Sequence, residues 1–202
     1  IGKVKLSARG TFTYARNKIV EYDELPQRYP WMAQTGMRIN ENYLYIAERL
    51  YTKEDFIVSK NGSGIETYTL RSELPQSTLG GLLGPGDIKY KDVNGDGIIN
   101  GSDEVAIGAT TKPNLIYGFG ISAQWKGFDF NAHFQGAGKS SFFINGPTVY
   151  AFSGSQWGNV LTNLVKNRYV DAETAATLGI PANENPNASY PRLSYGGNDN
   201  NY

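Results

Sequence analysis

Residues 114–136 alternate between apolar and polar side chains, and the alternation changes phase at Lys126-Gly127. The apolar positions before this dipeptide are Leu115, Tyr117, Phe119, Ile121, Ala123 and Trp125, and those after it are Phe128, Phe130, Ala132 and Phe134. A period of two is typical of a β-strand with one apolar face, and only Ile116 departs from it. A two-residue turn explains the change of phase, and the expected cross-strand pairs are Trp125 with Phe128, Ala123 with Phe130, Ile121 with Ala132 and Phe119 with Phe134. The sequence therefore predicts an antiparallel hairpin over about 114–136.

A further strand is predicted near the start of the chain, over about 3–14. Its apolar positions are Val4, Leu6, Ala8, Gly10, Phe12 and Tyr14, and its polar positions are Lys5, Ser7, Arg9, Thr11 and Thr13. The period is again two, so this strand also has one apolar and one polar face.

The length of these strands is compatible with two architectures. Each arm has about 9–11 residues, the length of a tilted membrane-spanning β-strand. Aromatic side chains near the strand ends would form an interfacial girdle, and the small, polar opposite face would suit a wet barrel interior. A soluble β-sandwich also has alternating strands, so the strands alone leave both architectures open.

The connections favour the barrel. Residues 15–113 separate the first strand from the hairpin and residues 137–202 follow it, whereas the hairpin turn has two residues. Short turns on one side and long loops on the other are typical of outer-membrane barrels. We therefore expect an all-β fold: antiparallel strands of part of a transmembrane β-barrel, with extracellular loops over about 15–113 and 137–202.

Apolar residues at helical spacing predict short helices inside both loops. They are Tyr43, Ile46, Ala47 and Leu50 within 41–51, and Trp157, Val160, Leu161, Leu164 and Val165 in the second loop. Each apolar face is expected to pack onto its own loop or to contact a partner protein.

The segment Asp92–Asp103 has the ligand spacing of a calcium loop. Oxygen-bearing side chains stand at loop positions 1, 3, 5, 9 and 12, and Gly97 stands at position 6. The expected Ca²⁺ ligands are the side chains of Asp92, Asn94, Asp96, Asn100 and Asp103 and the carbonyl of Ile98, with Glu104 as a neighbouring substitute for Asp103. Gly84, Pro85 and Gly108 leave no room for the flanking helices of an EF-hand, and Ile99 is expected to point inward. A turn of this composition without an ion is the alternative.

Composition excludes several classes of function. The formal net charge is zero, which argues against a nucleic-acid surface. The chain has no cysteine, so disulfide and thiol zinc sites are excluded. His133 is the only histidine and falls on the polar side of its strand, with no nucleophile evident beside it, so we expect no enzyme. The first residue is Ile1 and no signal peptide is evident, so we expect a fragment or a processed segment.

The segment from Gly86 to Gly97, G-D-I-K-Y-K-D-V-N-G-D-G, resembles a motif of the SusC/RagA family of TonB-dependent outer-membrane transporters of Bacteroidetes. The resemblance continues through 107–108, 113–114, 117–119, 126–130 and 134–136. It also includes 13–17, 45–48 and 185–193, so it covers nearly the whole chain.

The resemblance implies a barrel in the bacterial outer membrane, with a periplasmic plug domain and a SusD-like surface lipoprotein on its outer side. It further implies TonB-driven uptake of glycan or peptide cargo, a periplasmic turn at Lys126-Gly127 and an extracellular calcium loop. The plug, through which TonB acts, and the terminal strands are expected to lie outside this segment, and the substrate-binding residues are unknown. The alternative is a soluble, calcium-stabilised carbohydrate-binding β-module, which would partition to the aqueous phase without detergent.

Overall fold

The computed structural model describes residues 3–144, 150–152 and 159–194. The chain divides into two compact units, which we describe separately. The first unit comprises residues 1–43 and 106–143, and the second comprises residues 44–105 and 144–202.

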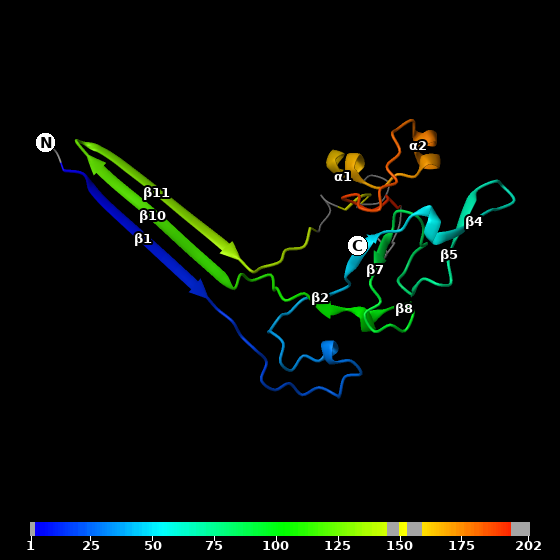
Figure 1. Ribbon diagram of the computed structural model, residues 1–202, viewed down its shortest axis with the longest axis horizontal. Coiled ribbons are helices and arrows are strands. Elements are labelled where there is room, and N and C mark those ends of the chain that lie inside the picture. Colours follow the sequence, from blue (N-terminus) through cyan, green and yellow to red (C-terminus); the bar gives the residue numbers. More distant parts are fainter. Residues whose placement is uncertain (1–2, 145–149, 153–158, 195–202) are drawn as a thin grey trace. The chain divides into compact units, whose positions relative to one another are not determined.

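The first unit is built on a three-stranded antiparallel sheet in the order β1-β10-β11 (Figure 1). The strands are β1 (Lys5–Tyr14), β10 (Leu115–Trp125) and β11 (Phe128–Gly138). At the β10–β11 turn, Lys126 has φ 48° and Gly127 has φ 88°. Positive φ at both central residues is typical of a type I′ turn, whose twist matches that of the flanking strands. The predicted first strand and hairpin are confirmed.

The register of the β10–β11 hairpin is also the predicted one. Trp125 pairs with Phe128, Ala123 with Phe130, Ile121 with Ala132 and Phe119 with Phe134. The β1–β10 pairing then places Leu6 beside Ala123 and Phe12 beside Tyr117. Because side chains alternate along each strand, all three strands present their apolar positions on the same face.

The second unit contains short strand pairs. Strand β3 (Ala47–Leu50) pairs antiparallel with β7 (Ile88–Tyr90), and β4 (Phe56–Lys60) forms a hairpin with β5 (Glu66–Leu70). Strand β6 (Gln76–Ser77) pairs parallel with β8 (Ile98–Ile99). A further pair joins β2 (Tyr43–Leu44) to β9 (Val105–Ala106), where the chain passes between the units.

The helical segments are few and short. They are the 3₁₀ turns Pro30–Met32 (η1), Lys53–Asp55 (η2) and Gly101–Asp103 (η3) and the α-helices Thr162–Asn167 (α1) and Ala172–Leu178 (α2). Strand residues outnumber helical residues in the described structure, so the all-β class is confirmed. Its strands do not form a closed barrel. Among the described residues, no helix has the length and apolar character needed to cross a membrane.

The buried core lies in the second unit and is largely aromatic. Its buried apolar residues are Leu50, Tyr51, Phe56, Tyr90, Ile99, Tyr169, Val170 and Ala175. The rings of Tyr51 and Phe56 meet edge-on with centroids 5.5 Å apart, and Tyr68 meets Phe56 in the same way at 5.9 Å. Burial, the largest cause, raises the pKa of Tyr51 and Tyr90 to about 12, so both remain neutral packing residues at physiological pH.

The predicted helix over 41–51 is wrong. Residues 43–44 and 47–50 are the strands β2 and β3, and Ala47 pairs with Tyr90 of β7. The amide of Leu50 donates to the carbonyl of Pro186. The backbone groups of this segment are thus hydrogen-bonded to residues distant in the sequence instead of to a local helical turn. Tertiary pairing therefore overrides the helical spacing of the apolar residues.

The predicted helix in the second loop is confirmed in part. The helix α1 contains Leu164 and Val165 but begins after Leu161, which is its N-cap. Trp157 lies outside the described residues. The β4–β5 hairpin and α2 were not predicted from the sequence. They form much of the regular structure of the second unit.

Candidate functional site

The segment Asp92–Asp103 forms one compact turn between β7 and β9. It contains β8 and the 3₁₀ turn η3. The side chain of Ile99 is 1% exposed, so it anchors the turn in the core as predicted. Gly95 and Gly97 have φ 72° and 81°, a left-handed conformation that favours glycine. The two glycines let the chain reverse while its amides point inward.

Asp103 lies at the centre of this turn and is fully buried. Its Oδ1 accepts hydrogen bonds from the amides of Val93 at 2.9 Å and Asn94 at 3.4 Å, and its Oδ2 accepts from the amide of Asn100 at 2.9 Å. Hydrogen bonds from backbone amides compensate the burial of the carboxylate. Asp103 thus ties the beginning of the loop to its end.

The other predicted ligands also bind amides of the loop. The two carboxylate oxygens of Asp92 accept from Gly95 at 2.7 Å and Gly97 at 2.8 Å. The side-chain oxygens of Asn94 and Asp96 accept from the amides two residues further on, each at 2.9 Å. This is the hydrogen bonding of successive Asx turns, in which a short polar side chain substitutes for a backbone acceptor.

The remaining members of the predicted set close the turn. Asn100 caps η3 by accepting from the amide of Ser102 at 2.8 Å, and its amide group lies 3.5 Å from the carbonyl of Ile98. Glu104 faces Tyr45 instead of the loop. Burial first and then the charge of Glu104 raise the pKa of Tyr45 to about 12.

All six predicted ligands therefore belong to a single turn. Their carboxylate oxygens, however, accept hydrogen bonds from backbone amides of the same turn. Within the described part of the chain, no three His, Cys, Asp or Glu side chains gather closely enough to hold a metal ion. Asp92, Asp96 and Asp103 thus do not share one coordination sphere in this structure. A bound Ca²⁺ would need about 6–8 oxygen ligands, so several of these amide bonds would have to rearrange.

An ion pair between the buried Asp87 and the partly exposed Arg192 was not predicted. Arg192 donates from Nε to Oδ1 of Asp87 at 2.7 Å and from Nη2 to Oδ2 at 2.9 Å. The side chain of Asp87 is fully buried and also accepts from the amide of Gly84 at 2.8 Å. Arg192 further reaches the carbonyl of Leu82 at 2.6 Å. We call these contacts the Asp87–Arg192 clasp; it joins the residues before β7 to the C-terminal segment.

Gly86 makes room for this clasp. Its φ is +88°, and a Cβ at this position would lie 2.4 Å from Cδ1 of Tyr169 and 2.9 Å from Cβ of Arg192. The amide of Gly86 donates to Tyr51, and its carbonyl accepts from Arg192. The glycine of the G-D-I-K-Y segment is therefore required by both its backbone conformation and its close contacts.

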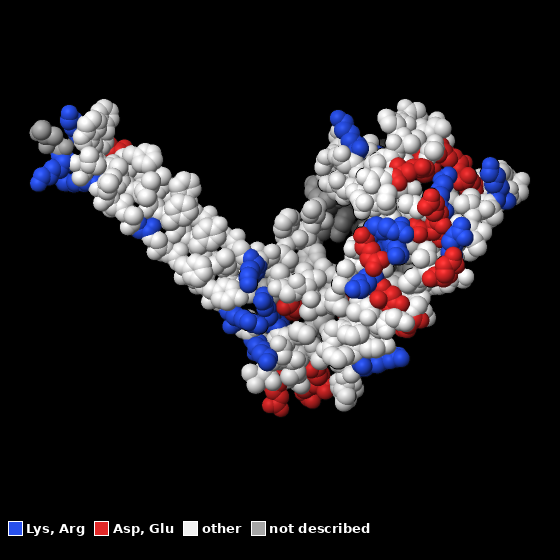
Figure 2. All heavy atoms as spheres, in the orientation of Figure 1, with Lys and Arg blue, Asp and Glu red and all other residues white. Residues whose placement is uncertain are grey.

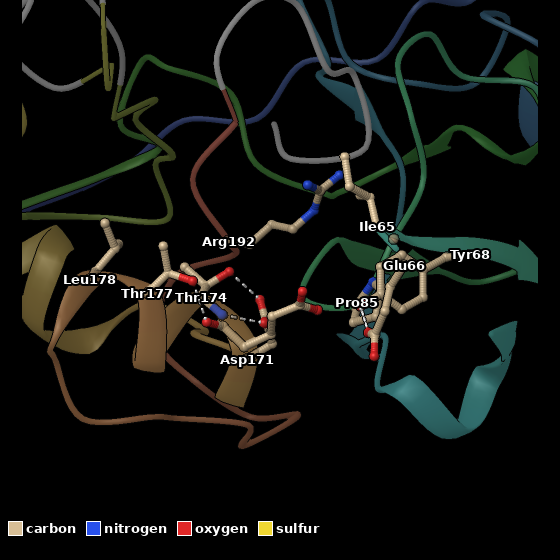
Figure 3. Close-up of a pocket in the computed structure, with 11 residues that line it drawn as sticks. Ile65, Glu66, Tyr68, Pro85, Asp171, Thr174, Thr177, Leu178 and Arg192 are labelled. Carbon is tan, nitrogen blue, oxygen red and sulfur yellow. Dashed lines mark hydrogen bonds between the residues drawn. The ribbon is translucent and has the colours of Figure 1, made fainter. Parts of the chain in front are cut away.

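A pocket of about 390 Å³ lies in the second unit between the β4–β5 hairpin and α2. Figure 3 shows Glu66 and Tyr68 on one side and Asp171 and Thr174 on the other. Asp171 caps α2 through the amide and the hydroxyl of Thr174, both at 2.8 Å. Glu66 accepts from Tyr68 at 2.6 Å and from Lys53 at 3.0 Å. Burial and then the bond to Glu66 raise the pKa of Tyr68. Both carboxylates therefore support the walls of the pocket.

The apolar face of the three-stranded sheet is uncovered in the described structure. Leu6, Phe12 and Phe128 are 77%, 74% and 76% exposed. The rings of Phe119 and Phe134 stack with centroids 4.9 Å apart. Figure 2 shows few charged atoms along the sheet, with Lys and Arg atoms gathered toward its two ends.

A lysine lies over an aromatic ring at each end of this face. At the turn, Nζ of Lys126 lies 5.0 Å from the ring centroid of Trp125. At the opposite end, Nζ of Lys139 lies 5.3 Å from that of Tyr14. Aromatic rings paired with lysine are typical of the two water interfaces of a membrane.

Comparison with known proteins gives one informative match. No protein-family model matches the chain. The chain is 36% identical over 88 residues to TonB-dependent receptor P26 of Formosa agariphila. The match covers 44% of this chain and 9% of that receptor, so the chain spans a small part of the length of its relative. This part of the chain is therefore similar to a segment of a TonB-dependent receptor.

Proposed function

We propose that this chain is a segment of a TonB-dependent importer in the bacterial outer membrane. The observation that carries the proposal is the uncovered, aromatic face of the β1–β10–β11 sheet, bounded at each end by a lysine–aromatic pair. An apolar face of this size exposed to water would be costly, whereas lipid would cover it.

The dimensions of the sheet agree with this proposal. Strands β10 and β11 have 11 residues each. At about 3.3 Å per residue they extend about 36 Å, and a tilt of about 45° reduces this to about 25 Å, the height of the apolar band of a membrane barrel. The opposite face carries small and polar residues, as the interior of such a barrel does.

A more specific assignment rests on the G-D-I-K-Y-K-D-V-N-G-D-G segment. We propose that the importer is of the SusC/RagA type and takes up glycans or peptides with a SusD-like surface lipoprotein. In this arrangement TonB acts through a plug domain, and residues 15–113 and 137–202 lie on the extracellular side. We further predict that the importer has no enzymatic activity on its cargo.

Fractionation and co-purification test this proposal. The full protein should remain with outer membranes through salt and alkaline washes and should require detergent for extraction. A SusD-like lipoprotein should co-purify with it, and the purified pair should bind oligosaccharides or peptides. Recovery of the full protein from the aqueous phase without detergent would instead favour the soluble carbohydrate-binding module.

We also propose that Ca²⁺ binds the Asp92–Asp103 turn, with the side chains of Asp92, Asn94, Asp96, Asn100 and Asp103 and the carbonyl of Ile98 as ligands. The support is the spacing of these residues and their placement in one turn. Hydrogen bonds from backbone amides to these side-chain oxygens stabilise the turn without the ion. The binding of Ca²⁺ should therefore increase the stability of the turn only modestly.

Calorimetry with CaCl₂ on the full protein tests the calcium proposal. We expect binding by the wild type and at least a tenfold weaker affinity for Asp96→Ala, because a carboxylate ligand is lost. Asp129→Ala, which changes a carboxylate on strand β11, is the matched control and should leave the affinity unchanged. An absence of binding heat in the wild type would show that the turn needs no ion.

A further inference from the structure

The polar face of the β1–β10–β11 sheet contains a cleft that lies outside the Asp92–Asp103 turn and the Asp87–Arg192 clasp. Its volume is about 290 Å³, and it is lined by Arg9, Thr11, His133 and Gln135 together with Ile116 and Tyr117. The floor includes Gly118, a buried residue of β10. No acidic side chain lines the cleft. We call this the β10 cleft.

Strand register brings the donors of the β10 cleft together. Gly120 lies between Arg9 of β1 and His133 of β11, and Gly118 lies between Thr11 and Gln135. The side chains on both flanking strands therefore lean over two positions that have no side chain of their own. Three paired strands fix this arrangement, so it depends on the sheet and not on a loop.

The spacing over the glycines is close. A Cβ built on Gly120 would lie 3.2 Å from Nε of Arg9, 3.1 Å from Nδ1 of His133 and 3.2 Å from the carbonyl oxygen of Ala132. A Cβ built on Gly118 would lie 3.1 Å from Oγ1 of Thr11. The guanidinium, imidazole and hydroxyl groups thus converge above the backbone, and larger residues at these positions would push them apart.

The cationic group of the cleft has no carboxylate partner within the described structure. The four ion pairs there use Arg49, Lys53, Lys89 and Arg192. Asp129 lies on the same face but four residues along β11 from His133, closer to the turn and beside Gln124. An exposed arginine with neighbouring side-chain donors and no nearby acid is suited to an oxyanion, which its planar guanidinium can bind through two hydrogen bonds.

We propose that the β10 cleft binds an oxyanion group, a carboxylate or a sulfate, carried by a ligand. In this site Arg9 supplies the charge, and Thr11, His133 and Gln135 donate hydrogen bonds. The assignment of this ligand as imported cargo rests on the proposed function, in which this face lines the barrel interior. The class of cargo would then be acidic.

Titration calorimetry of the full protein in detergent with sodium sulfate and sodium acetate tests the site. Arg9→Gln should weaken the binding of at least one anion by about 10-fold or more, because a charge-assisted hydrogen bond is lost. Gly120→Val should weaken it as well by displacing the Arg9 and His133 side chains. Lys5→Gln removes a positive charge from the same face of β1 outside the cleft and should leave the affinity within about twofold, as expected for an exposed charge.

Equal affinity in the wild type and Arg9→Gln, or no heat with either anion, would overturn the site. Equal unfolding midpoints for the three variants would show that any loss is not a folding defect. A protein that proves soluble without detergent would contradict the proposed importer but would leave this titration readable, since the titration requires only the folded sheet.

Discussion

Replacing Arg192 with glutamine is expected to destabilise the second unit by about 2–3 kcal/mol, because the buried carboxylate of Asp87 loses charge-assisted hydrogen bonds. The cost is below that of a fully buried ion pair, since the Arg192 side chain is 29% exposed. The carboxylate of Asp87 is fully buried and accepts two hydrogen bonds from Arg192. The glutamine side chain cannot supply the charge or the paired donors. The carboxylate would then have to take up a proton or become exposed to water, and either change opens the clasp.

Hydrogen exchange of the amides around the clasp measures this effect. Tyr51 donates to the carbonyl of Asp87, Gly86 donates to Tyr51, and Gly84 donates to the Asp87 carboxylate. These three amides should exchange faster in Arg192→Gln, while those of β10 should be unaffected. Arg71→Gln is the matched control, because Arg71 is exposed and donates to one carbonyl, that of Glu54.

A double-mutant cycle isolates the pair itself. Asp87→Asn combined with Arg192→Gln should cost less than the two single changes added together, because neither charge is then left alone. Additive costs would show that the two side chains stabilise the unit independently and would contradict the clasp.

Replacing Ile121 with arginine is expected to destabilise the sheet in a lipid bilayer by about 2–4 kcal/mol, the cost of a basic residue near the midplane of a membrane barrel. Ile121 lies near the middle of β10 on the apolar face and is 51% exposed in the structure. Its cross-strand neighbours are Ala8 and Ala132, which provide no counter-charge.

Ser122→Arg is the matched control because it places the same side chain one residue further on, on the polar face. It should change the free energy of unfolding by less than about 0.5 kcal/mol, as is usual for a solvated surface position. Denaturant titration of the full protein in lipid vesicles measures both variants. Equal costs for Ile121→Arg and Ser122→Arg would show that the two faces meet the same medium.

The sheet was predictable because its information is local. The period of two through 114–136 and the phase change at Lys126-Gly127 together determine the turn, the facing pairs and the apolar face. The turn needs positive φ at both positions, and the strands need only their own alternation. The addition of β1 followed from the same pattern in a separate segment, although its partner strand could not be read from the sequence.

The second unit was largely unpredictable because its contacts are not local. Residues 47–50 carry helical spacing, yet β7 and Pro186 supply their backbone partners. Asp87 and Arg192 are 105 positions apart, so no spacing rule connects them. In the Asp92–Asp103 turn the sequence placed the six oxygen donors in one loop, but it could not show that Asp103 would become the buried centre of an amide network.

The central claim is that one face of β10 meets lipid and the other meets water. The chain contains no cysteine. After replacement of any cysteine elsewhere in the full protein, single cysteines are placed at each position from 117 to 124 and labelled with a nitroxide. In membranes, odd positions should be relaxed mainly by dissolved oxygen and even positions mainly by a water-soluble nickel complex, with a period of two. Uniform access of the nickel complex to all eight positions would contradict the membrane-spanning sheet.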